Sequence, residues 1–278
     1  MTQSQRTAIV SGAAGGIGRA LVGGLLQAGI RVAAVDRTAD GLAALASGLP
    51  AHTADLLTVT ADLADDRAIP NIVEQARRRF GPIGILVNNA GVGQATLKPG
   101  NWQEPLRFWE IAAEQWRLFV AVHTTAPLLL AQAVLPDMRQ AGWGRIVNVT
   151  TSLGTMLRSG SPTYGPSKAA LEALSAIMAK DLADTGITVN VLVPGGVTNT
   201  PMVPQESGFD RAAMIQPETM VPPLVWLVSD AAGEVTGRRF LAVHWDTALP
   251  PREAAGKAGA PVAWTDIATM PIEPPRRR

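Results

Sequence analysis

Tyr164 and Lys168 are the residues best suited to acid–base chemistry. Tyr164 is the only tyrosine in the 278-residue chain, and a lysine four positions later lies on the same face of a helix. A phenol has an ordinary pKa of about 10 and carries protons poorly at neutral pH. A neighbouring ammonium favours the phenolate and lowers that pKa. The spacing therefore predicts a proton-transfer pair, although a half-buried tyrosine packed beside a lysine would show the same spacing.

A glycine-rich turn follows the first apolar segment of the chain, with Gly12, Gly16 and Gly18 around Ile17. Glycines at such positions let the backbone turn tightly and approach a pyrophosphate, which rests on the N-terminus of the next helix. The turn by itself could serve backbone geometry only. Asp36, which ends the second apolar segment, favours the binding interpretation, because a carboxylate there can bind the ribose hydroxyls of a dinucleotide.

The identity of the dinucleotide depends on Asp36 and its neighbour Arg37. A carboxylate repels a 2′-phosphate, which favours NAD over NADP. An arginine beside the ribose can instead pair with that phosphate. We therefore expect NAD, with NADP as the possible alternative. The positive charge of the oxidised nicotinamide should add to that of Lys168 in lowering the pKa of Tyr164.

The elements that must position these residues alternate along the chain, which is typical of an α/β fold with a parallel sheet covered on both faces. Strands are predicted at Thr7–Ser11, Arg31–Val35, within Ala54–Thr60, and at Ile83–Asn88, Arg145–Val149, Ile187–Val193 and Arg239–Val243. Helices are predicted at Ile17–Ala28, Asp66–Phe80, Glu114–Arg139, Ser167–Ala183 and Pro217–Ser229.

Two segments interrupt this alternation. The first, Val92–Ala113, is a long loop that contains Trp102 and Trp109. The second follows the last predicted strand and is rich in proline and alanine. We predict one dinucleotide-binding and catalytic domain over residues 1–245 and a C-terminal extension over residues 246–278.

Composition excludes several classes of protein. The chain is 47% apolar and 17% charged, with a net charge of +1. This balance fits a packed globular core and offers no electrostatic surface for nucleic acid. The chain has no cysteine, which excludes disulfides and thiolate metal sites, and no metal site is predicted. No signal region is evident and no apolar run approaches the length of a membrane span, so we expect a cytoplasmic protein.

Four motifs in this order resemble the short-chain dehydrogenase/reductase family over about residues 5–245: the glycine turn, Asn88-Asn89-Ala90-Gly91, Tyr164-x-x-x-Lys168 and Pro194-Gly195. The resemblance implies a Rossmann-type doubly wound parallel sheet of about seven strands. It also implies hydride transfer between NAD(P) and an alcohol or ketone without a metal. The further residues it places at the cofactor are Asp62, Leu63, Asn89, Ala90, Gly91, Val197 and Thr200, together with Tyr164 and Lys168.

Two positions depart from the family pattern. The family usually has a serine 13 residues before the tyrosine to orient the substrate oxygen, and here Thr151 occupies that place beside Ser152. The family also has a water-holding asparagine where this chain has His123. Imidazole can hold water and titrates near neutral pH, so we expect His123 to act as a proton relay. The alternative is that His123 only packs, as most lone histidines on helices do.

The substrate is the least defined part of the prediction. Trp102, Trp109 and Ser152 are candidates to line the substrate pocket, although the two rings could equally pack on the C-terminal extension or on a second subunit. Three functions remain open: a secondary-alcohol dehydrogenase or ketone reductase, a reductase of 3-oxoacyl thioesters, and a catalytically weak cofactor-binding sensor. Asp36 argues mildly against the second, because such reductases favour NADPH.

The resemblance also implies a homotetramer or homodimer. The helices around Glu114–Arg139 and Ser167–Ala183 would pack against their symmetry mates. Their apolar faces include Leu128, Leu129, Leu171 and Leu174.

Overall fold

The strands form one mixed sheet in the part of the chain that the computed structural model describes, residues 6–268. The strand order is β3-β2-β1-β4-β5-β6-β7-β8. The first seven strands are parallel, and β8 runs antiparallel to β7. The strands are β1 Thr7–Ser11, β2 Arg31–Asp36, β3 Leu56–Thr60, β4 Ile85–Asn88, β5 Gly144–Val149, β6 Ile187–Val193, β7 Arg238–Leu241 and β8 Gly259–Pro261.

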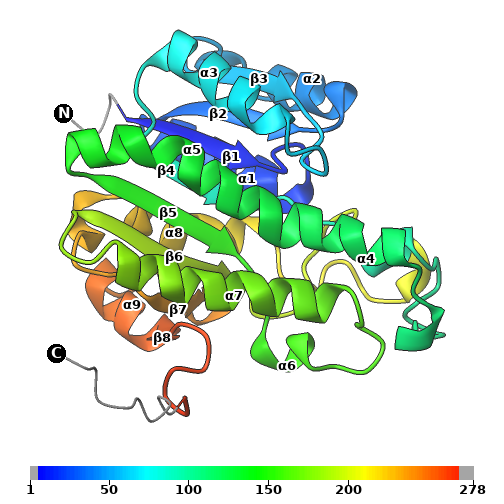
Figure 1. Cartoon of the computed structure of the whole chain (residues 1–278). Coiled ribbons are helices and arrows are strands. Elements are labelled where there is room, and N and C mark those ends of the chain that lie inside the picture. Colours follow the sequence, from blue (N-terminus) through cyan, green and yellow to red (C-terminus); the bar gives the residue numbers. More distant parts are fainter. Residues whose placement is uncertain (1–5, 269–278) are drawn as a thin grey trace, which may run out of the picture.

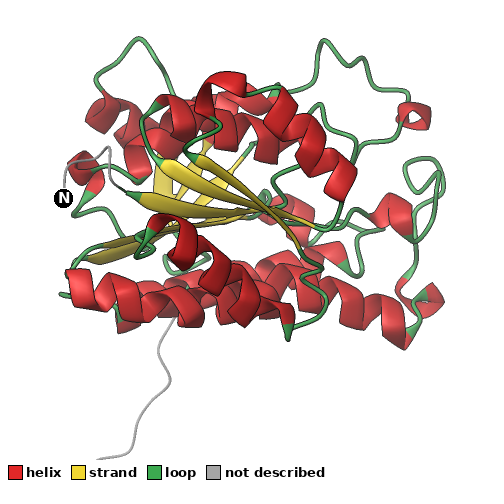
Figure 2. Cartoon of the chain, turned by 90° about the horizontal axis from the view of Figure 1, so that it is seen from above, coloured by secondary structure: helices red, strands yellow, loops and turns green. Residues whose placement is uncertain are grey.

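Helices cover both faces of this sheet (Figures 1 and 2). One face carries α1 Gly16–Gln27, α2 Ala39–Ser47, α8 Val221–Leu227 and α9 Pro251–Ala258. The other carries α3 Ala68–Phe80, α5 Ala126–Ala141 and α7 Tyr164–Asp181. The remaining α-helices are α4 Ala113–Val120 and α6 Leu153–Met156. Short 3₁₀ turns lie at η2 Pro50–His52, η3 Gln94–Thr96, η4 Phe108–Glu110, η6 Gln205–Ser207, η7 Pro217–Met220, η8 Asp230–Ala232 and η9 Ala242–His244.

The uninterrupted apolar runs of the central strands result from burial on both sides of the sheet. In β1, Ala8 and Val10 belong to the core under α1, whereas Ile9 belongs to the opposite core under α3 and α5. Successive side chains of a strand point to opposite faces, so each strand supplies both cores. The predicted doubly wound α/β fold is confirmed.

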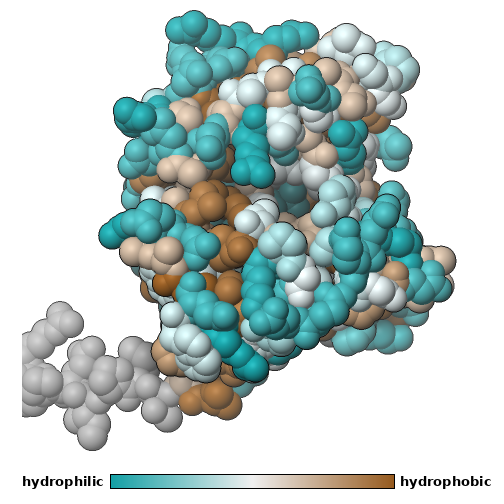
Figure 3. Space-filling model, turned by 90° about the vertical axis from the view of Figure 1, so that its right-hand side faces the viewer, coloured by the Kyte–Doolittle hydropathy of each residue, from teal (hydrophilic) through white to brown (hydrophobic). Residues whose placement is uncertain are grey.

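The strand order reverses between β1 and β4, which are neighbours in the sheet. In folds of this type, ligands bind outside the carboxyl ends of the strands at this switch point. The arrowheads of β1 and β5 point to this edge in Figure 1. Seen from this side, apolar surface gathers near the centre of the molecule and is bordered by polar side chains (Figure 3).

Several predicted elements differ from those observed. The continuous helix expected over Glu114–Arg139 contains a π-helical turn, η5 Ala121–Thr125, between α4 and α5. Helix α7 begins at Tyr164, three residues earlier than expected. Strand β7 ends at Leu241, where a 3₁₀ turn replaces its expected last two residues. The short helix α2 was not predicted.

The C-terminal extension joins the main domain. Ala254, Ala255 and Ala258 of α9 are buried in the core under α8, and β8 extends the sheet. The sheet therefore has eight strands instead of about seven. The last ten residues of the predicted extension lie outside the described residues.

The segment Ala113–Ala141 is a 29-residue helix that is long and apolar enough to cross a membrane by length and composition. The expectation that no apolar run approaches that length is therefore wrong for this segment. Its second half packs against α3, β4 and β5, and Leu130, Val134 and Met138 are fully buried there. The apolar character of this segment is that of a core helix.

Candidate active site

A groove at the switch point brings together seven of the predicted cofactor residues. It is lined by Gly12, Asp36, Arg37, Ala61, Asp62, Leu63, Ala90, Gly91, Val92, Leu118 and Val122. These residues come from the carboxyl ends of β1, β2, β3 and β4 and from the helix above them. The groove thus has the place in the fold that a dinucleotide requires.

The turn after β1 needs glycine at two positions for steric reasons. Gly12 has φ +64°, and a Cβ atom on it would lie 2.7 Å from the Cα of Ala90. A Cβ on Gly18 would lie 2.0 Å from the carbonyl oxygen of Gly12. The first contact places the turn against the loop after β4, and the second places the start of α1 against the turn.

Asn89 joins the loop after β4 to the turn after β1. Its Nδ2 donates to the carbonyl oxygens of Ser11 (3.0 Å) and Gly12 (3.1 Å). The backbone N–H groups of Asn89 and Ala90 both donate to the Ser11 hydroxyl, at 3.0 and 3.1 Å. Ser11 is a structural partner that sequence reasoning missed, because its position before Gly12 looks like the end of a strand.

Asp36 lies at the end of β2 with both carboxylate oxygens bonded. Oδ2 accepts from the backbone N–H of Ala14 at 3.0 Å. Oδ1 accepts from the N–H of Thr38 at 3.0 Å and from its hydroxyl at 2.8 Å. The carboxylate therefore stays in the groove and fixes the glycine turn, and Oδ2 keeps a further acceptor direction.

The segment after β6 forms the opposite wall of the site. Gly195 has φ +105°, and a Cβ on it would lie 2.3 Å from a methyl of Val243. The carbonyl oxygen of Pro194 accepts from the N–H of Val243 at 3.2 Å. Thr200 lies over the start of α1, since a Cβ on Gly16 would lie 2.8 Å from its methyl group.

A backbone hydrogen bond and the side chain of Arg211 hold this wall in place. The carbonyl oxygen of Val197 accepts from the N–H of Ile215 at 3.0 Å. Arg211 donates to the carbonyl oxygen of Thr200 at 3.0 Å and to that of Val203. The residues predicted at the nicotinamide side thus lie on an ordered segment.

Tyr164 opens helix α7, and Lys168 follows one turn later with its Nζ 6.0 Å from the centre of the tyrosine ring. The ammonium donates to the carbonyl oxygen of Val149 at 2.9 Å, which fixes it below the end of β5. Burial lowers the pKa of Lys168 to about 8. Burial also raises the pKa of Tyr164 to about 12. In the protein alone burial has the larger effect on the phenol, and the lowering expected from the ammonium together with the oxidised nicotinamide stays a prediction.

Thr151 is at the place predicted for the substrate-oxygen donor. Its side chain hydrogen-bonds to the Tyr164 hydroxyl, which partly offsets the effect of burial on the pKa of the phenol. Ser152 next to it precedes α6, and its carbonyl oxygen accepts the N–H groups of Thr155 and Met156. The geometry thus brings Thr151 to the tyrosine and gives the backbone of Ser152 a helix-starting role.

His123 lies in the π-helical turn and is fully buried. Its Nε2 accepts from the N–H of Val92 at 2.8 Å, so this nitrogen carries no proton. Its Nδ1 lies 2.8 Å from the hydroxyl of Ser167, which itself donates to the carbonyl oxygen of Tyr164 at 3.1 Å. In the neutral imidazole Nδ1 is then the donor.

These contacts correct the expected relay role of His123. Both ring nitrogens are occupied by protein groups, so neither is free to hold a relay water. Burial, and secondarily the charge of Lys168, lowers the pKa of His123 well below its usual value. His123 instead connects the loop after β4 to the start of α7, and its ring packs edge-on against that of Tyr164, with centroids 5.4 Å apart.

The two tryptophans of the long loop have different surroundings. Trp102 packs edge-on against Phe209 with ring centroids 5.0 Å apart, and Arg158 lies over its ring at 5.2 Å. Trp102 therefore joins its loop to the segment after β6 and to the chain after α6. Trp109 is 70% exposed and packs on Phe108, which is 75% exposed. This pair faces solvent, so Trp109 does not line a pocket within the single chain.

A dinucleotide groove at the switch point beside a Tyr–Lys pair defines an oxidoreductase of the Rossmann type. The sequence matches the short chain dehydrogenase family over residues 6–209. The chain therefore belongs to the short-chain dehydrogenase family.

Three known proteins show how far the similarity extends. The chain is 32% identical over 243 residues to cis-4-hydroxycyclohexanecarboxylate dehydrogenase from Sinomonas cyclohexanicum, covering 84% of this chain and 93% of the relative. It is 29% identical over 241 residues to 3-oxoacyl-(acyl-carrier-protein) reductase from Escherichia coli, with the same coverage. The crystal structure of a proposed NAD(P)-dependent gluconate 5-dehydrogenase from Beutenbergia cavernae, with NADP bound at low occupancy, superimposes with a TM-score of 0.73. That pair is 32% identical over 85% of this chain and 94% of the other, which supports the predicted NAD(P) cofactor.

Proposed function

We propose that this protein interconverts a secondary alcohol and a ketone with NAD(P), using Tyr164 to transfer the proton. The observation that carries the proposal is the placement of Tyr164, Thr151 and Lys168 together at the carboxyl edge of the sheet, next to the dinucleotide groove. When bound, NAD(P) supplies or accepts the hydride at its nicotinamide ring.

Tyr164 acts as the acid in ketone reduction. Its raised pKa keeps the phenol protonated at neutral pH, which is the form that gives a proton to the substrate oxygen. The hydroxyl of Thr151 donates a hydrogen bond to the same oxygen and stabilises the negative charge that develops there. Alcohol oxidation reverses these roles and requires the phenolate.

Lys168 supplies the positive charge nearest to the phenol. A cation close to Tyr164 favours the phenolate and so lowers the cost of proton removal during oxidation. The hydrogen bond from Lys168 to Val149 fixes the ammonium at the end of β5. In this position the ammonium can also hold the ribose next to the nicotinamide.

We further propose NAD as the preferred cofactor. Asp36 is held in the groove by Ala14 and Thr38, and a fixed carboxylate there repels a 2′-phosphate. Gly12, Gly16, Ile17 and Gly18 would hold the pyrophosphate, and Asp62 and Leu63 would border the adenine.

Reduction of 3-oxoacyl thioesters is the second candidate. It is supported by the 29% identity to the Escherichia coli reductase over 93% of that relative. It requires the same Tyr164 and Thr151 chemistry on a longer substrate. Asp36 weighs against it, because biosynthetic reductases of this kind favour NADPH.

The test is turnover of a substrate panel by the wild-type protein and by Tyr164→Phe. Secondary alcohols with NAD⁺ and cyclic, linear and thioester ketones with NADH or NADPH separate the two candidates. We expect Tyr164→Phe to lower kcat by at least about 10²-fold, the usual contribution of one acid–base group, with nearly unchanged cofactor affinity. Cofactor binding without turnover of any panel member would favour a sensor instead.

Thr151 variants provide the matched comparison in the same assay. Thr151→Ser keeps the donor, and we expect a mild effect. Thr151→Val keeps the shape without the donor and should lower kcat by about 10²-fold, as loss of one oxyanion donor does. If Ser152→Ala were more damaging than Thr151→Val, Ser152 would be the donor.

A further inference from the structure

Glu172 is a fully buried carboxylate on the catalytic helix α7 that the proposed chemistry does not use. It lies one helical turn beyond Lys168, on the same face of α7. Its side chain has no solvent exposure and belongs to an ion pair with Arg239 of β7, whose side chain is also buried. Burying two charges is costly unless every polar atom is satisfied.

The contacts of this pair converge on the segment that carries Thr151. Glu172 Oε2 accepts from the hydroxyl of Thr150 at 2.6 Å. Glu172 Oε1 accepts from Arg239 Nε at 3.0 Å. Arg239 then donates from Nη2 to the carbonyl oxygen of Thr151 at 3.2 Å. The two residues at the start of this loop are thus each held through Glu172, one directly and one through the arginine.

The C-terminal extension completes the same network. The backbone N–H of Ala263 donates to Glu172 Oε1 at 3.1 Å. Ala263 has φ +59°, a conformation that few non-glycine residues adopt. The neighbouring Val262 is buried against Val191 and Val193 of β6, which keeps this turn under α7. Figure 1 shows α7, β7 and β8 side by side at this end of the sheet.

We propose that Glu172 and Arg239 are positioning residues that hold Thr151 against Tyr164, and that the C-terminal extension completes their site through Ala263. The arrangement connects helix α7, which carries Tyr164 and Lys168, with the loop that carries Thr151. The inference rests on the proposed function for its kinetic consequence, but its structural consequence can be measured without any substrate.

The first experiment measures hydrogen exchange of the backbone amides over residues 150–156 in the wild type and in Arg239→Met. Two of these amides, Thr155 and Met156, are protected by bonds to the carbonyl oxygen of Ser152. We expect Arg239→Met to speed their exchange by about 10-fold, because the loop loses its anchor at Thr151. Unchanged exchange would overturn the positioning role whether or not the protein is an enzyme.

The double variant Glu172→Leu/Arg239→Met tests the same loop without leaving an unpaired buried charge that could unfold the protein. Replacing both members of a buried pair with apolar residues of similar volume is often neutral for stability, whereas removing one partner leaves a buried charge. The double variant still lacks the bonds to Thr150 and Thr151. Its exchange over residues 150–156 should therefore rise as in the single variant.

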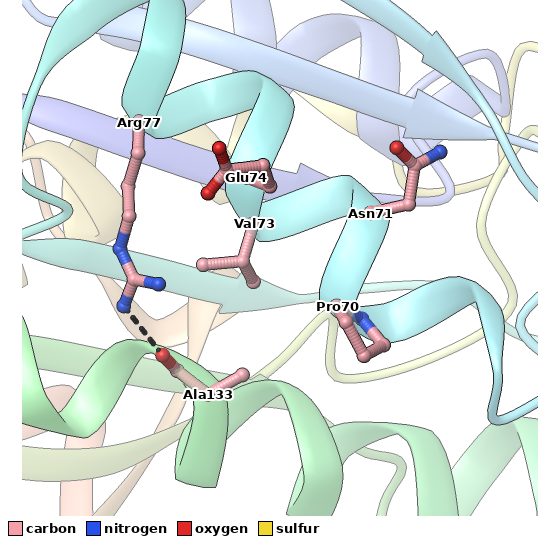
Figure 4. A pocket seen from close by; sticks show the side chains of 6 residues that line it. All are labelled: Pro70, Asn71, Val73, Glu74, Arg77 and Ala133. Carbon is pink, nitrogen blue, oxygen red and sulfur yellow. Dashed lines mark hydrogen bonds between the residues drawn. The ribbon is translucent and has the colours of Figure 1, made fainter.

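Arg77→Met is the matched control. Arg77 donates from Nε to Asp137 at 2.8 Å and from Nη2 to the carbonyl oxygen of Ala133 at 2.8 Å. It thus repeats the pattern of Arg239, one carboxylate and one backbone carbonyl, between α3 and α5. Figure 4 shows the bond from Arg77 to Ala133 at a surface pocket outside the proposed active site. We expect Arg77→Met to leave exchange over residues 150–156 and kcat unchanged.

The second experiment is a double-mutant cycle on kcat, with a substrate from the panel. If Arg239 acts through Thr151, Arg239→Met should lower kcat about 10-fold in the wild type and have almost no effect in Thr151→Val, because coupled residues are not additive. Equal effects in both backgrounds would overturn the proposal. Absence of any turnover would count against the proposed function and leave the exchange result to decide the positioning role.

Val262→Asp in the full-length protein tests the part of the extension. A carboxylate cannot stay buried against Val191 and Val193, so this turn should leave its site and Glu172 should lose the N–H of Ala263. We expect faster exchange over residues 150–156 than in the wild type. If the variant exchanges these amides at the wild-type rate, the extension is not part of the positioning network.

Discussion

Burial determines the charge of the polar groups around Tyr164. It raises the pKa of the phenol to about 12 and lowers that of Lys168 to about 8. It also lowers the pKa of His123 well below its usual value. All three shifts favour the neutral form of the group, so the protein without cofactor holds a neutral histidine and a protonated phenol. Only Lys168 is left to change charge within the range in which the reaction can be measured.

The pKa of Lys168 predicts how kcat/KM for ketone reduction falls at alkaline pH. The ammonium is present below about pH 8 and is lost as the pH rises through that value, so kcat/KM for reduction should be constant below pH 8 and fall above it. This parameter reports ionisations of the free enzyme. Lys168→Met should have a low kcat/KM at every pH, without the fall above pH 8. Lys180→Met changes an exposed lysine on the same helix and should keep that fall. A constant kcat/KM up to about pH 9.5 would show that Lys168 stays protonated.

The lowered pKa of His123 predicts that the folded protein loses stability at acidic pH. The folded protein keeps the imidazole neutral, whereas the unfolded chain takes up a proton below about pH 6.5. Stability is therefore unaffected by this group above pH 6.5 and falls as the pH is lowered, by at most about 1.4 kcal/mol per pH unit. We expect urea unfolding at pH 5.0 and 7.5 to show a larger acid loss for the wild type than for His123→Asn. The other two of the three histidines are common to both proteins. Equal losses of stability in the two proteins would mean that His123 has the same pKa in the folded and the unfolded chain.

The elements show where sequence patterns suffice and where they do not. The buried strands, the glycine turn and the order of the motifs follow from local residue types, because the central strands are buried on both faces and glycine is needed where backbones approach. The π-helical turn at His123 could not be predicted, since it depends on contacts with Val92 and Ser167 that come from distant parts of the chain. Strand β8 has three residues including a proline and no strand signal of its own.

Some residues of the candidate site could likewise be predicted from the sequence, and others could not. Tyr164 and Lys168 could be proposed from their spacing within the chain, whereas Thr151, Asp62 and Leu63 were implied by the resemblance to the family. The Glu172–Arg239 pair could not be proposed, because its two members lie 67 residues apart and only the fold brings them together. The position of Trp109 stayed open between a pocket wall and a packing surface, because aromatic residues in a long loop suit both.

Asp36 at the end of β2 leads to a prediction about cofactor choice. NADH should bind more tightly than NADPH. Asp36→Asn should reduce the ratio of the two affinities by about 10-fold, because it removes the negative charge and keeps an oxygen that accepts from Ala14. Asp36→Ala should also weaken NADH, because the turn loses that acceptor. Fluorescence titration of both cofactors measures these affinities. Tighter binding of NADPH by the wild type would show that Arg37 outweighs the carboxylate.

At the scale of the molecule, β8 of the C-terminal extension pairs with the edge strand β7. The layer formed by α5 and α7 is not covered by other described elements. Leu171 is 1% exposed, so it packs inside the subunit and cannot contact a partner as expected. Leu128, Leu129 and Leu174 are only partly buried. Ile177 of α7 is 55% exposed, and Trp116 of α4 is also exposed. Large apolar side chains on neighbouring elements of one layer are typical of a surface that a second subunit covers.

We therefore expect a homodimer or homotetramer in which this layer packs against its symmetry mate, with Ile177 in the contact. In a two-fold interface each substitution occurs on both sides, so Ile177→Glu places two like charges in an apolar contact. This variant should shift the assembly to a smaller species in light scattering at micromolar concentration, with the far-UV circular dichroism of the wild type. Ile267→Glu is the matched control, because Ile267 is 81% exposed in the C-terminal extension, outside this layer. It should leave the assembly unchanged. A wild-type monomer at these concentrations would contradict the prediction outright, and an Ile177→Glu variant of wild-type size would place the contact on another face.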